Sequence, residues 1–529
     1  MATFALPARR PALNREEVYR HRYLIAFAVV LASVLELIDT SIVNVAIPHM
    51  MGNLGATLEE IAWVSTGYIV ANVIVLPITG WLSARFGRRN YYTGSILLFT
   101  AASFLAGNAH TLEELVGARV IQGIGGGALI STAQAILFDI FPIAERGIAM
   151  AIFGVGVMVG PTLGPTLGGW ITDNFSWPWI FYINLPLGAF AAMATWRYVP
   201  EPQHTSERTE QMDWLGLALL ILGIGCLQIL LEHGETKGWF ESREILIEAI
   251  VSAVALIGFI WHELTTAHPI VNLRVLRNRQ LAAGVTFGLA LGFGLYASVF
   301  ALPIFLQSLL GYSAWDTGLV ILPGAISSAV TMAIVGRFSG KIDARILIAT
   351  GLALFFWAMW KHYHFTLDIG KHDLLLPMIL RGVGLGLVFV PLSQLTVADL
   401  RPDQYAQGTG LYNLSRQLGG SFGIAVGASL LTRFSVQSRD ALLPHLSLAE
   451  PAARTWVDRA TAAMLQHGGS PAEAHTKALA LLQFTLERQA RVVAFEKLFL
   501  AMGVTLALTF PLLFLFRIGR TQAGSPTAH

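Results

Sequence analysis

The amino-acid sequence predicts an all-α, polytopic integral membrane protein, organised as two six-helix bundles with two further helices inserted between them. Hydrophobic residues fill 54% of the 529 positions and charged residues only 13%, whereas soluble domains average about 25% charged residues. Long apolar runs recur along the whole chain, and two stretches of the sequence echo each other. The formal net charge of +2 gives no reason to expect a nucleic-acid partner.

About fourteen apolar runs approach the length of roughly 20 residues that a membrane-crossing helix needs. They cover residues 23–49, 60–82, 91–109, 112–138, 146–172, 178–198, 214–232, 245–264, 281–305, 315–338, 346–366, 374–398, 407–433 and 493–517. An even number of spans places both termini on the same side of the membrane. The first run lacks the features of a cleaved signal peptide, so we expect it to remain as a helix.

The distribution of basic residues indicates on which side of the membrane the two termini lie. One set of short loops, together with the start of the C-terminal tail, holds most of them: Arg85, Arg88, Arg89, Arg146, Arg197, Arg208, Arg274, Arg277, Arg279, Arg337, Lys341, Arg345, Arg401, Arg517 and Arg520. The opposite short loops hold only Lys237, Arg243, Lys361 and Lys371. Because Lys and Arg accumulate in cytoplasmic loops, we expect cytoplasmic tails at 1–22 and 518–529.

An internal repeat supports the two-bundle plan. The segment Gly80–Arg89 after the second span resembles Gly336–Arg345 after the tenth, and Arg119–Gly125 in the fourth resembles Arg381–Gly386 in the twelfth. Duplicated halves are typical of secondary transporters. We therefore divide the chain into a first bundle at 23–198, an inserted pair at 199–264 and a second bundle at 265–517.

Residues 434–492 interrupt the pattern of short loops. They are polar, lie outside the membrane in this topology, and contain two expected helices at 452–466 and 471–487, the second beginning with Pro471 after Ser470. Long connections are usually functional or disordered. This segment therefore serves either to dock a partner or as a solvated spacer.

Two carboxylates lie inside the first apolar run. Acidic residues within a membrane span are costly and usually mark a path for protons or substrate. Glu36 and Asp39 are three positions apart and so share one helix face. Their mutual repulsion favours proton uptake by one of them, which suits a reversible proton carrier. The alternative is that both acids are simply hydrogen-bonded between helices.

Arg119 offers Asp39 a partner. The fourth span enters near Leu112, which places Arg119 roughly 10 Å deep, and Asp39 lies roughly 14 Å below Pro48. A buried guanidinium needs an opposite charge, and these two reach similar depths. The pair is either part of a proton-coupling site or a permanent structural ion pair.

Five motifs in this order carry a resemblance to a known family. They are Ile38–Pro48, Gly80–Arg89, Arg119–Gly127, Gly154–Gly169 and Trp177–Pro186. The chain resembles the fourteen-helix drug:proton antiporter family of the major facilitator superfamily, in particular its EmrB-like multidrug efflux transporters. The resemblance covers nearly the whole chain.

The resemblance implies a major facilitator fold and a proton-coupled antiporter that exports amphipathic, toxic compounds by alternating access. It implies the proton-motive force as energy source, with no cofactor, and antibiotic resistance as an outcome. Asp39 would be the protonatable acid, Arg119 its tuning charge and Glu36 a second candidate acid. Segment 434–492 would meet a periplasmic adaptor protein and, through it, an outer-membrane channel, so that the chain is the inner-membrane part of a tripartite pump.

Other motif residues would serve the conformational change. Glycines and prolines give the fifth span a small-residue face for close helix packing, in a segment that resembles the family's export-associated element; plain tight packing is the alternative. We assign this conformational group to Gly80, Arg85, Gly87, Arg88, Gly156, Gly160, Pro161, Gly164, Pro165, Gly168, Gly169 and Arg381.

The chain departs from the family at two positions. Ala84 stands where relatives often carry Asp, so the salt bridge made by that acid must be absent or replaced. Glu36 stands where many relatives are neutral. An additional acid there would either favour cationic substrates or carry a second proton.

Polar and aromatic residues of several spans are candidates for lining a large substrate cavity. A cavity wall of this composition can bind chemically diverse amphiphiles. They are Tyr68, Asn72, Gln122, Gln134, Phe287, Tyr296, Gln307, Gln394, Asn413, Arg416 and Gln417. The alternative is that they make interhelical hydrogen bonds or pack in the core.

Two further functions stay open. A dedicated exporter of one metabolite or siderophore-like anion would use Arg119, Arg381 and Arg416 as substrate ligands. A non-transporting membrane sensor or scaffold would not depend on Asp39 and Arg119. An enzyme is disfavoured, because no catalytic constellation stands out and the single Cys226 and the scattered histidines suggest no metal site.

Overall fold

The computed structural model describes residues 15–201, 212–338, 341–446, 450–466 and 470–516, and the regular elements of these residues are helices. The first half of the chain contains eight of them. They are α1 (Arg15–Leu54), α2 (Leu58–Phe86), α3 (Arg88–Gly107), α4 (Leu112–Gly126), α5 (Leu129–Ile140), α6 (Arg146–Asn174), α7 (Trp179–Tyr182) and α8 (Asn184–Tyr198). Arg208, Arg517, Arg520 and the outer parts of both predicted tails lie outside the described residues.

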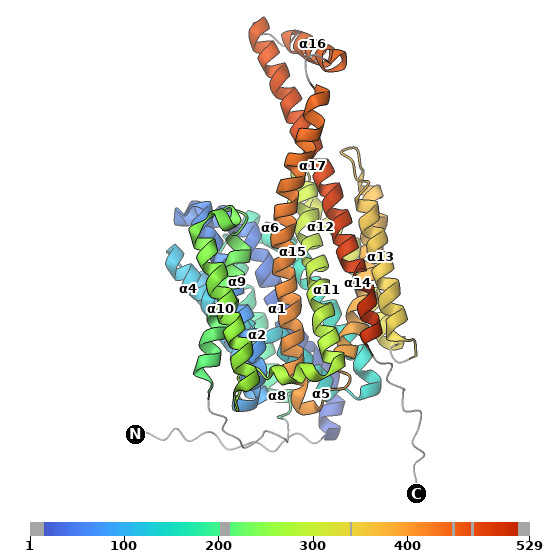
Figure 1. The fold of residues 1–529 in the computed structure, drawn as a ribbon. Coiled ribbons are helices and arrows are strands. Elements are labelled where there is room, and N and C mark those ends of the chain that lie inside the picture. Colours follow the sequence, from blue (N-terminus) through green and yellow to red (C-terminus); the bar gives the residue numbers. More distant parts are fainter. Residues whose placement is uncertain (1–14, 202–211, 339–340, 447–449, 467–469, 517–529) are drawn as a thin grey trace.

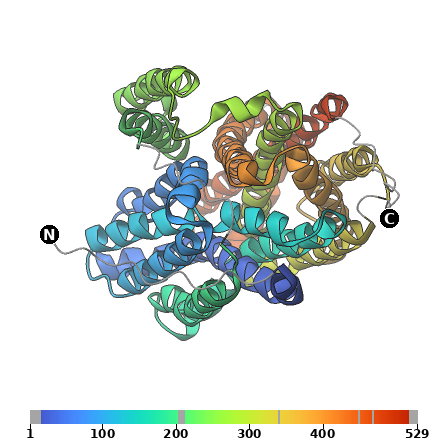
Figure 2. The same ribbon diagram turned by 90° about the horizontal axis from the view of Figure 1, so that it is seen from below.

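The remaining helices form an inserted pair and a second half. The pair is α9 (Trp214–His233) and α10 (Arg243–Thr265); the second half is α11 (Arg279–Ile304), α12 (Ala314–Phe338), α13 (Ala344–His362), α14 (Lys371–Val397), α15 (Tyr405–Leu442), α16 (Pro451–Gln466) and α17 (Pro471–Ala507). Seen from below, the two halves lie side by side, with the green pair α9 and α10 at the outer edge (Figure 2).

Twelve helical segments of the described residues are long and apolar enough to cross a membrane. One segment joins α4 and α5, as the sequence predicts for its fourth span, and another joins α7 to α8. Helices α3 and α15 coincide with the third and thirteenth predicted spans but are not among the twelve. Both carry many polar residues, α3 from its first turn (Arg88, Arg89, Asn90) onward. The all-helical, polytopic fold class is confirmed.

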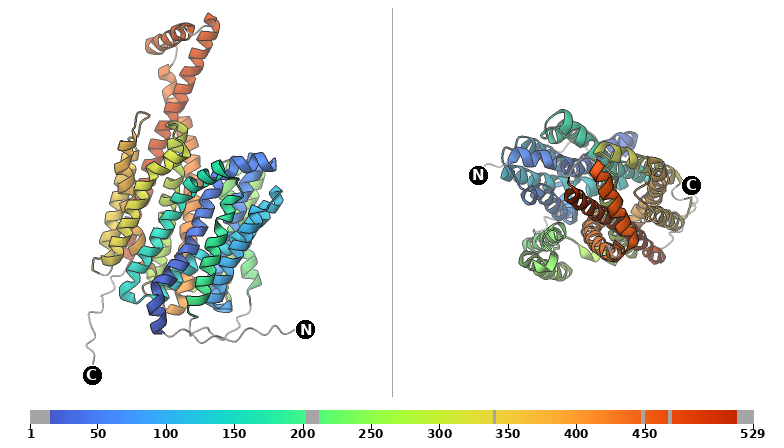
Figure 3. Two further views of the ribbon diagram at one scale, coloured as in Figure 1. Left: turned by 180° about the vertical axis from the view of Figure 1, so that it is seen from behind. Right: turned by 90° about the horizontal axis from the view of Figure 1, so that it is seen from above.

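The molecule has two distinct ends. We call the end where α1 begins and the short helix η7 (Phe510–Leu515) closes the described chain the terminal face, and the opposite end the hairpin face (Figure 1). Beyond the hairpin face, α15 and α17 continue as long rods that carry α16 at their tip (Figures 1 and 3). Segment 434–492 is therefore largely a continuation of two spans: α15 passes Phe434 without a break, and α17 is a single helix from its Ser470 cap onward.

The inserted pair touches both halves. Helix α9 packs against α10, α2 and α15. At its hairpin-face end the His233 Nε2 atom lies 3.3 Å from the Thr66 hydroxyl of α2, and one turn further in Gln228 Nε2 donates to the Ser421 hydroxyl of α15 at 2.9 Å. The pair therefore bridges the halves along one flank of the molecule.

The two halves also meet directly at the terminal face. Arg146 Nη2 donates to the Tyr405 hydroxyl at 2.8 Å, and Asn413 Nδ2 donates to Gln134 Oε1 at 2.8 Å. Ala84, which replaces the family's usual acid, is exposed. The hydrogen bond from Arg146 to Tyr405 is thus a direct contact between the halves at this face.

Removing the Tyr405 hydroxyl should loosen this contact. A hydrogen bond to a charged group contributes about 1.5 kcal/mol or more, so Tyr405→Phe should raise the ratio of terminal-face-open to closed molecules by about tenfold. Distances between spin labels at the ends of α5 and α15 would report the change. Tyr182→Phe is the matched control, because its hydroxyl bonds Gly107 O within one half. Equal distributions in both variants would contradict the assignment.

Candidate transport site

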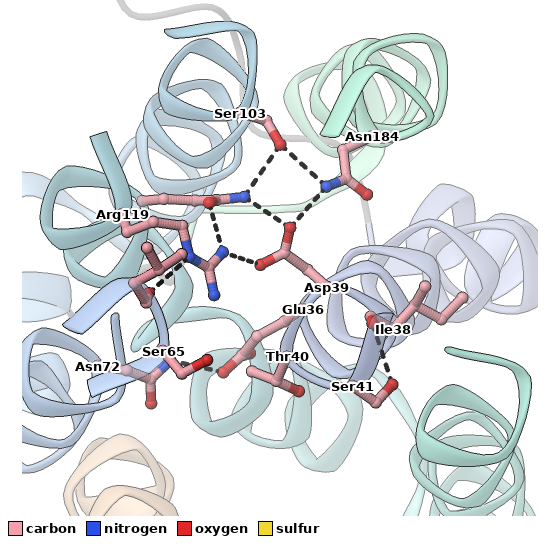
Figure 4. A network of polar contacts seen from close by, with 12 residues as sticks. Glu36, Ile38, Asp39, Thr40, Ser41, Ser65, Asn72, Ser103, Arg119 and Asn184 are labelled. Atoms are coloured by element: carbon pink, nitrogen blue, oxygen red, sulfur yellow. Dashed lines mark hydrogen bonds and ion pairs between the residues drawn. The ribbon is translucent and has the colours of Figure 1, made fainter. Parts of the chain in front are cut away.

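The buried centre of the first half is an ion pair between α1 and α4. Arg119 Nη1 donates to Asp39 Oδ2, and the two residues are 1% and 0% exposed. Breaking a buried pair by removing one partner costs about 3–5 kcal/mol, because the other charge is left uncompensated. The structure thus brings together the two residues whose depths matched in the sequence (Figure 4).

Two side-chain amides complete the surroundings of Asp39. Gln122 Nε2 and Asn184 Nδ2 each donate to Asp39 Oδ1 at 2.9 Å, and the Ser103 hydroxyl lies within hydrogen-bond distance of both amides. With Arg119, three N–H donors converge on the two carboxylate oxygens. Residues of α1, α3, α4 and α8 therefore depend on the charge of one carboxylate (Figure 4).

Arg119 makes further contacts beside the ion pair. It also donates from Nε to Val64 O at 3.1 Å and from Nη1 to Gln122 Oε1 at 2.7 Å. Its guanidinium lies 4.2 Å from the centroid of the Tyr68 ring, within the range of a cation–π interaction. This arginine therefore connects Asp39 of α1 with α2 and with its own helix α4.

Glu36 lies one turn before Asp39 but has different neighbours. Its Oε1 accepts from Asn72 Nδ2 at 2.7 Å, while Oε2 has no hydrogen-bond partner among the described residues. The residue is 4% exposed and lies within electrostatic range of Arg416 in the other half. The two acids thus have separate partners. Both carboxylate oxygens of Asp39 accept hydrogen bonds, whereas Glu36 Oε2 accepts none from the described residues.

Arg416 is the most unusual polar side chain of the second half. It is 2% exposed, and its Nε and Nη1 atoms have no acceptor among the described residues. The hydroxyls of Tyr412, one turn away on α15, and of Tyr68 on α2 are also buried without a hydrogen-bond partner in the part of the chain that the structure describes. Because unpaired buried donors are costly, Arg416 requires an acceptor such as water or a bound anion.

The other predicted cavity residues divide among several environments. Gln122 belongs to the Asp39 network, Asn72 binds Glu36, and Gln134 and Asn413 bond each other across the halves. Tyr296 donates to Gln417 Oε1 at 3.5 Å. Phe287 is buried in the hydrophobic core and Gln307 is exposed. Gln394 is half-buried and interacts with other residues of the chain. Tyr68, Asn72 and Arg416 are the members that accompany Glu36.

The conformational motif residues are also placed. Arg88 pairs with Asp139 within the first half at 3.0 Å, and Arg85 is exposed. Gly87 adopts a φ of +81° with the Glu201 carboxylate against its Cα. Burial raises the pKa of the Glu201 carboxyl, an effect that the charge of nearby Arg89 opposes. Arg381, the counterpart of Arg119 in the repeat, has no acidic partner among the residues that the structure describes.

Sequence reasoning missed Asn184 and Ser103. Asn184 lies in the Trp177–Pro186 motif, where an amide within an apolar stretch was a usable signal. Ser103 gave no signal, because a serine in a span usually bonds its own helix. Only the packing of α3 beside α4 and α8 brings its hydroxyl to the two amides.

Several known proteins are similar in sequence to this chain over most of its length. Residues 29–424 match the family model of the Major Facilitator Superfamily. The chain is 37% identical to the multidrug export protein EmrB of Haemophilus influenzae, over 81% of this chain and 82% of that protein. EmrB of Escherichia coli is 36% identical, over 77% and 80%. The fatty acid resistance protein FarB of Neisseria gonorrhoeae is 34% identical, over 92% and 94%.

The fold has a counterpart among solved structures. The human organic anion transporter MFSD10 superposes with a TM-score of 0.57, covering 92% of this chain and 99% of that one at 15% identity. At this low identity the likeness concerns the fold alone.

Proposed function

The chain belongs to the major facilitator superfamily and is an EmrB-like multidrug efflux transporter, and we propose that it exports amphipathic compounds in exchange for protons by alternating access. The observation that carries this proposal is the buried Asp39, whose single charge holds Arg119 and two amides together from two other helices, α4 and α8. A proton-driven machine needs such a group, because one protonation there changes contacts between several helices at once.

The coupling step follows from this geometry. A proton that binds Asp39 cancels the charge that Arg119 requires, which weakens the ion pair and the amide hydrogen bonds together. The helices that meet there are then released to move relative to one another. Loss of the proton on the other side of the membrane restores the network and resets the transporter, so that the proton-motive force drives the cycle.

The orientation follows from charge. Described basic residues of the short loops gather at the terminal face, among them Arg85, Arg274 and Arg401, whereas the short loops of the hairpin face hold Lys237, Arg243, Lys361 and Lys371. By the positive-inside rule, we assign the terminal face to the cytoplasm. The contact of Arg146 with Tyr405 then represents a state whose halves are joined on the cytoplasmic side.

Reconstituted vesicles test the proposal. A pH gradient imposed across proteoliposomes should drive accumulation of several chemically unrelated amphipathic drugs, and collapse of the gradient should abolish it. Accumulation that ignores the gradient would contradict proton coupling. Transport of a single compound class would replace the multidrug proposal with a dedicated exporter, and no transport of any compound would favour the sensor or scaffold.

The extension beyond the hairpin face suits a periplasmic adaptor protein that links the pump to an outer-membrane channel. Ala453 and Val457 of α16 are buried in its packing against α17, whereas Leu481 and Phe484 of α17 are exposed. Apolar side chains exposed on a rigid rod outside the membrane mark an interaction surface. Phe484→Ser should reduce adaptor co-purification and leave transport in adaptor-free vesicles unchanged; retained adaptor would contradict this surface.

A second candidate function, export of anionic amphiphiles, is favoured by Arg416. Its two unpaired donors suit a carboxylate, and one relative is named for fatty acid resistance. Arg416→Gln should lower transport of a carboxylate-bearing amphiphile by at least about tenfold, the loss of one charge-assisted hydrogen bond. Transport of its neutral amide analogue is the control. An equal loss for both compounds would indicate a structural role for Arg416.

A further inference from the structure

We propose that a groove between α3 and α8 binds an anionic phospholipid, with an acyl chain along the groove and the phosphate at Arg89. The residues that line this site are not part of the network of Asp39, although α3 and α8 also carry Ser103 and Asn184 of that network. The proposal does not depend on the transport cycle and is tested separately from it.

The groove has the shape of an acyl-chain site. It has a volume of about 520 Å³ and is lined by one face of each helix, at Gly94 and Leu97 on α3 and at Ala189, Met193 and Trp196 on α8. The small residues Gly94 and Ala189 open the space between the helices. From Asn90 to Leu97 it extends roughly 10 Å along the helix axis, which matches several methylene groups of a lipid chain.

The groove faces outward. Leu97 is 52% exposed and Met193 68% exposed, although both are large apolar side chains; α8 belongs to one of the twelve membrane-crossing segments, and α3 coincides with the third predicted span. In the bilayer such residues contact lipid. We therefore expect a lipid chain to occupy the groove.

The mouth of the groove, at the terminal face, is basic. The Arg89 guanidinium lies 5.2 Å from the ring centroid of Trp196, which lines the groove, and Arg197 is exposed beside it. Arg89 Nε has no hydrogen-bond partner among the described residues, but it forms an ion pair with Glu201 Oε2 at 3.9 Å. Another nearby acid, Asp139, forms its ion pair with Arg88. Arg89 and Arg197 outnumber the single carboxylate of Glu201, so the mouth carries a net positive charge that attracts a phosphate.

A second polar group lies in the groove wall. Thr93 lines the groove, is 5% exposed, and its Oγ1 has no hydrogen-bond partner in the described chain. It follows Arg89 by four residues, about one helical turn deeper. An ester or glycerol oxygen of the same lipid would satisfy this hydroxyl, just as the phosphate satisfies Arg89.

Another groove in the first half provides an internal comparison. It has a volume of about 320 Å³ between α1 and α6 and is lined by apolar and aromatic residues, including Tyr23 and Phe27. The arginine near it, Arg22, is already paired with Glu145 at 3.1 Å and donates to Tyr19 O. We expect lipid chains there without a preference for an anionic head group.

The test measures lipid binding to purified, delipidated full-length protein by native mass spectrometry. Phosphatidylglycerol and phosphatidylcholine with identical chains are compared, with glycerol phosphate as a head group without chains. Phosphatidylglycerol should bind at least about fivefold more tightly, the contribution of one basic residue at a membrane surface. Arg89→Gln should remove this preference, whereas Arg22→Gln should keep it.

A second variant blocks the groove without touching its charge. A side chain at Gly94 would meet no atom within 4 Å, so Gly94→Leu should fold normally and fill the space; Gly117→Leu on α4 is the matched control, with the same free surroundings. Gly94→Leu should lower phosphatidylglycerol binding at least about fivefold, because methylene groups of the acyl chain lose their contacts in the groove. Equal binding of both lipids to the wild type, binding unchanged in Gly94→Leu, or full competition by glycerol phosphate would each overturn the proposal.

Discussion

Asp39→Asn should abolish accumulation of substrate driven by a pH gradient, to the level of empty vesicles, while substrate exchange without a gradient continues. The asparagine keeps the size of the side chain and can still accept from Gln122 or Asn184, but it cannot bind and release a proton. Uptake measured in proteoliposomes, with and without the gradient, separates these two activities. Loss of both would point to a damaged structure, and retention of both would remove Asp39 from the coupling step.

The same change leaves Arg119 buried and uncompensated, which should cost about 3–5 kcal/mol of stability. The double variant Asp39→Asn/Arg119→Gln removes the stranded charge and should recover most of the loss in thermal unfolding. It should remain uncoupled, since no proton carrier has been restored. A double variant that is stable and still accumulates substrate along a pH gradient would show that the pair is structural.

Gly164→Val should prevent α1 and α6 from packing and should destabilise the protein by about 3 kcal/mol or more. A Cβ at Gly164 would overlap the Ser41 hydroxyl and approach the Ile42 backbone nitrogen to 3.1 Å, and a Cβ at Gly160 would lie 2.5 Å from Leu37 Cβ. Because α1 also carries Glu36 and Asp39, separating these helices disturbs the proton site as well. Thermal unfolding in detergent and the yield of folded protein would measure the effect.

Gly169→Val is the control for this packing. A Cβ there would lie 4.0 Å from Val45 Cγ1, an ordinary contact. The two variants add the same side chain to the same helix five positions apart. Equal stability of both would contradict the close packing of α1 on α6 and would favour a role for these glycines in bending the helix.

Much of the fold could be predicted from the sequence, because a bilayer demands long apolar helices and so leaves a clear pattern. The spans, the helices expected at 452–466 and 471–487, and the proximity of Asp39 and Arg119 all followed from length, capping and depth. The continuation of α15 and α17 beyond the membrane did not. Hydropathy marks where a helix leaves the apolar core, and a polar helix can continue past that point.

The details of the site depended on packing between helices. Glu36 and Asp39 share a face of α1, yet Asn72 of α2 holds one acid and Asn184 of α8 helps to hold the other. Repetition in the sequence suggested that Arg381 would resemble Arg119, but the second half places no acid beside it among the described residues. Which side chains meet is set by helix rotation, which a single sequence does not reveal.

Proton release on substrate binding tests the central claim most directly. Purified protein in weakly buffered detergent solution should release protons when a transported drug is added, as a pH-sensitive dye reports. The Asp39→Asn/Arg119→Gln variant should release none, and Glu36→Gln should either release as the wild type does or lose only a second proton. Release that persists without Asp39, or a wild type that binds substrate and releases no proton, would contradict the account of Asp39 as the coupling group.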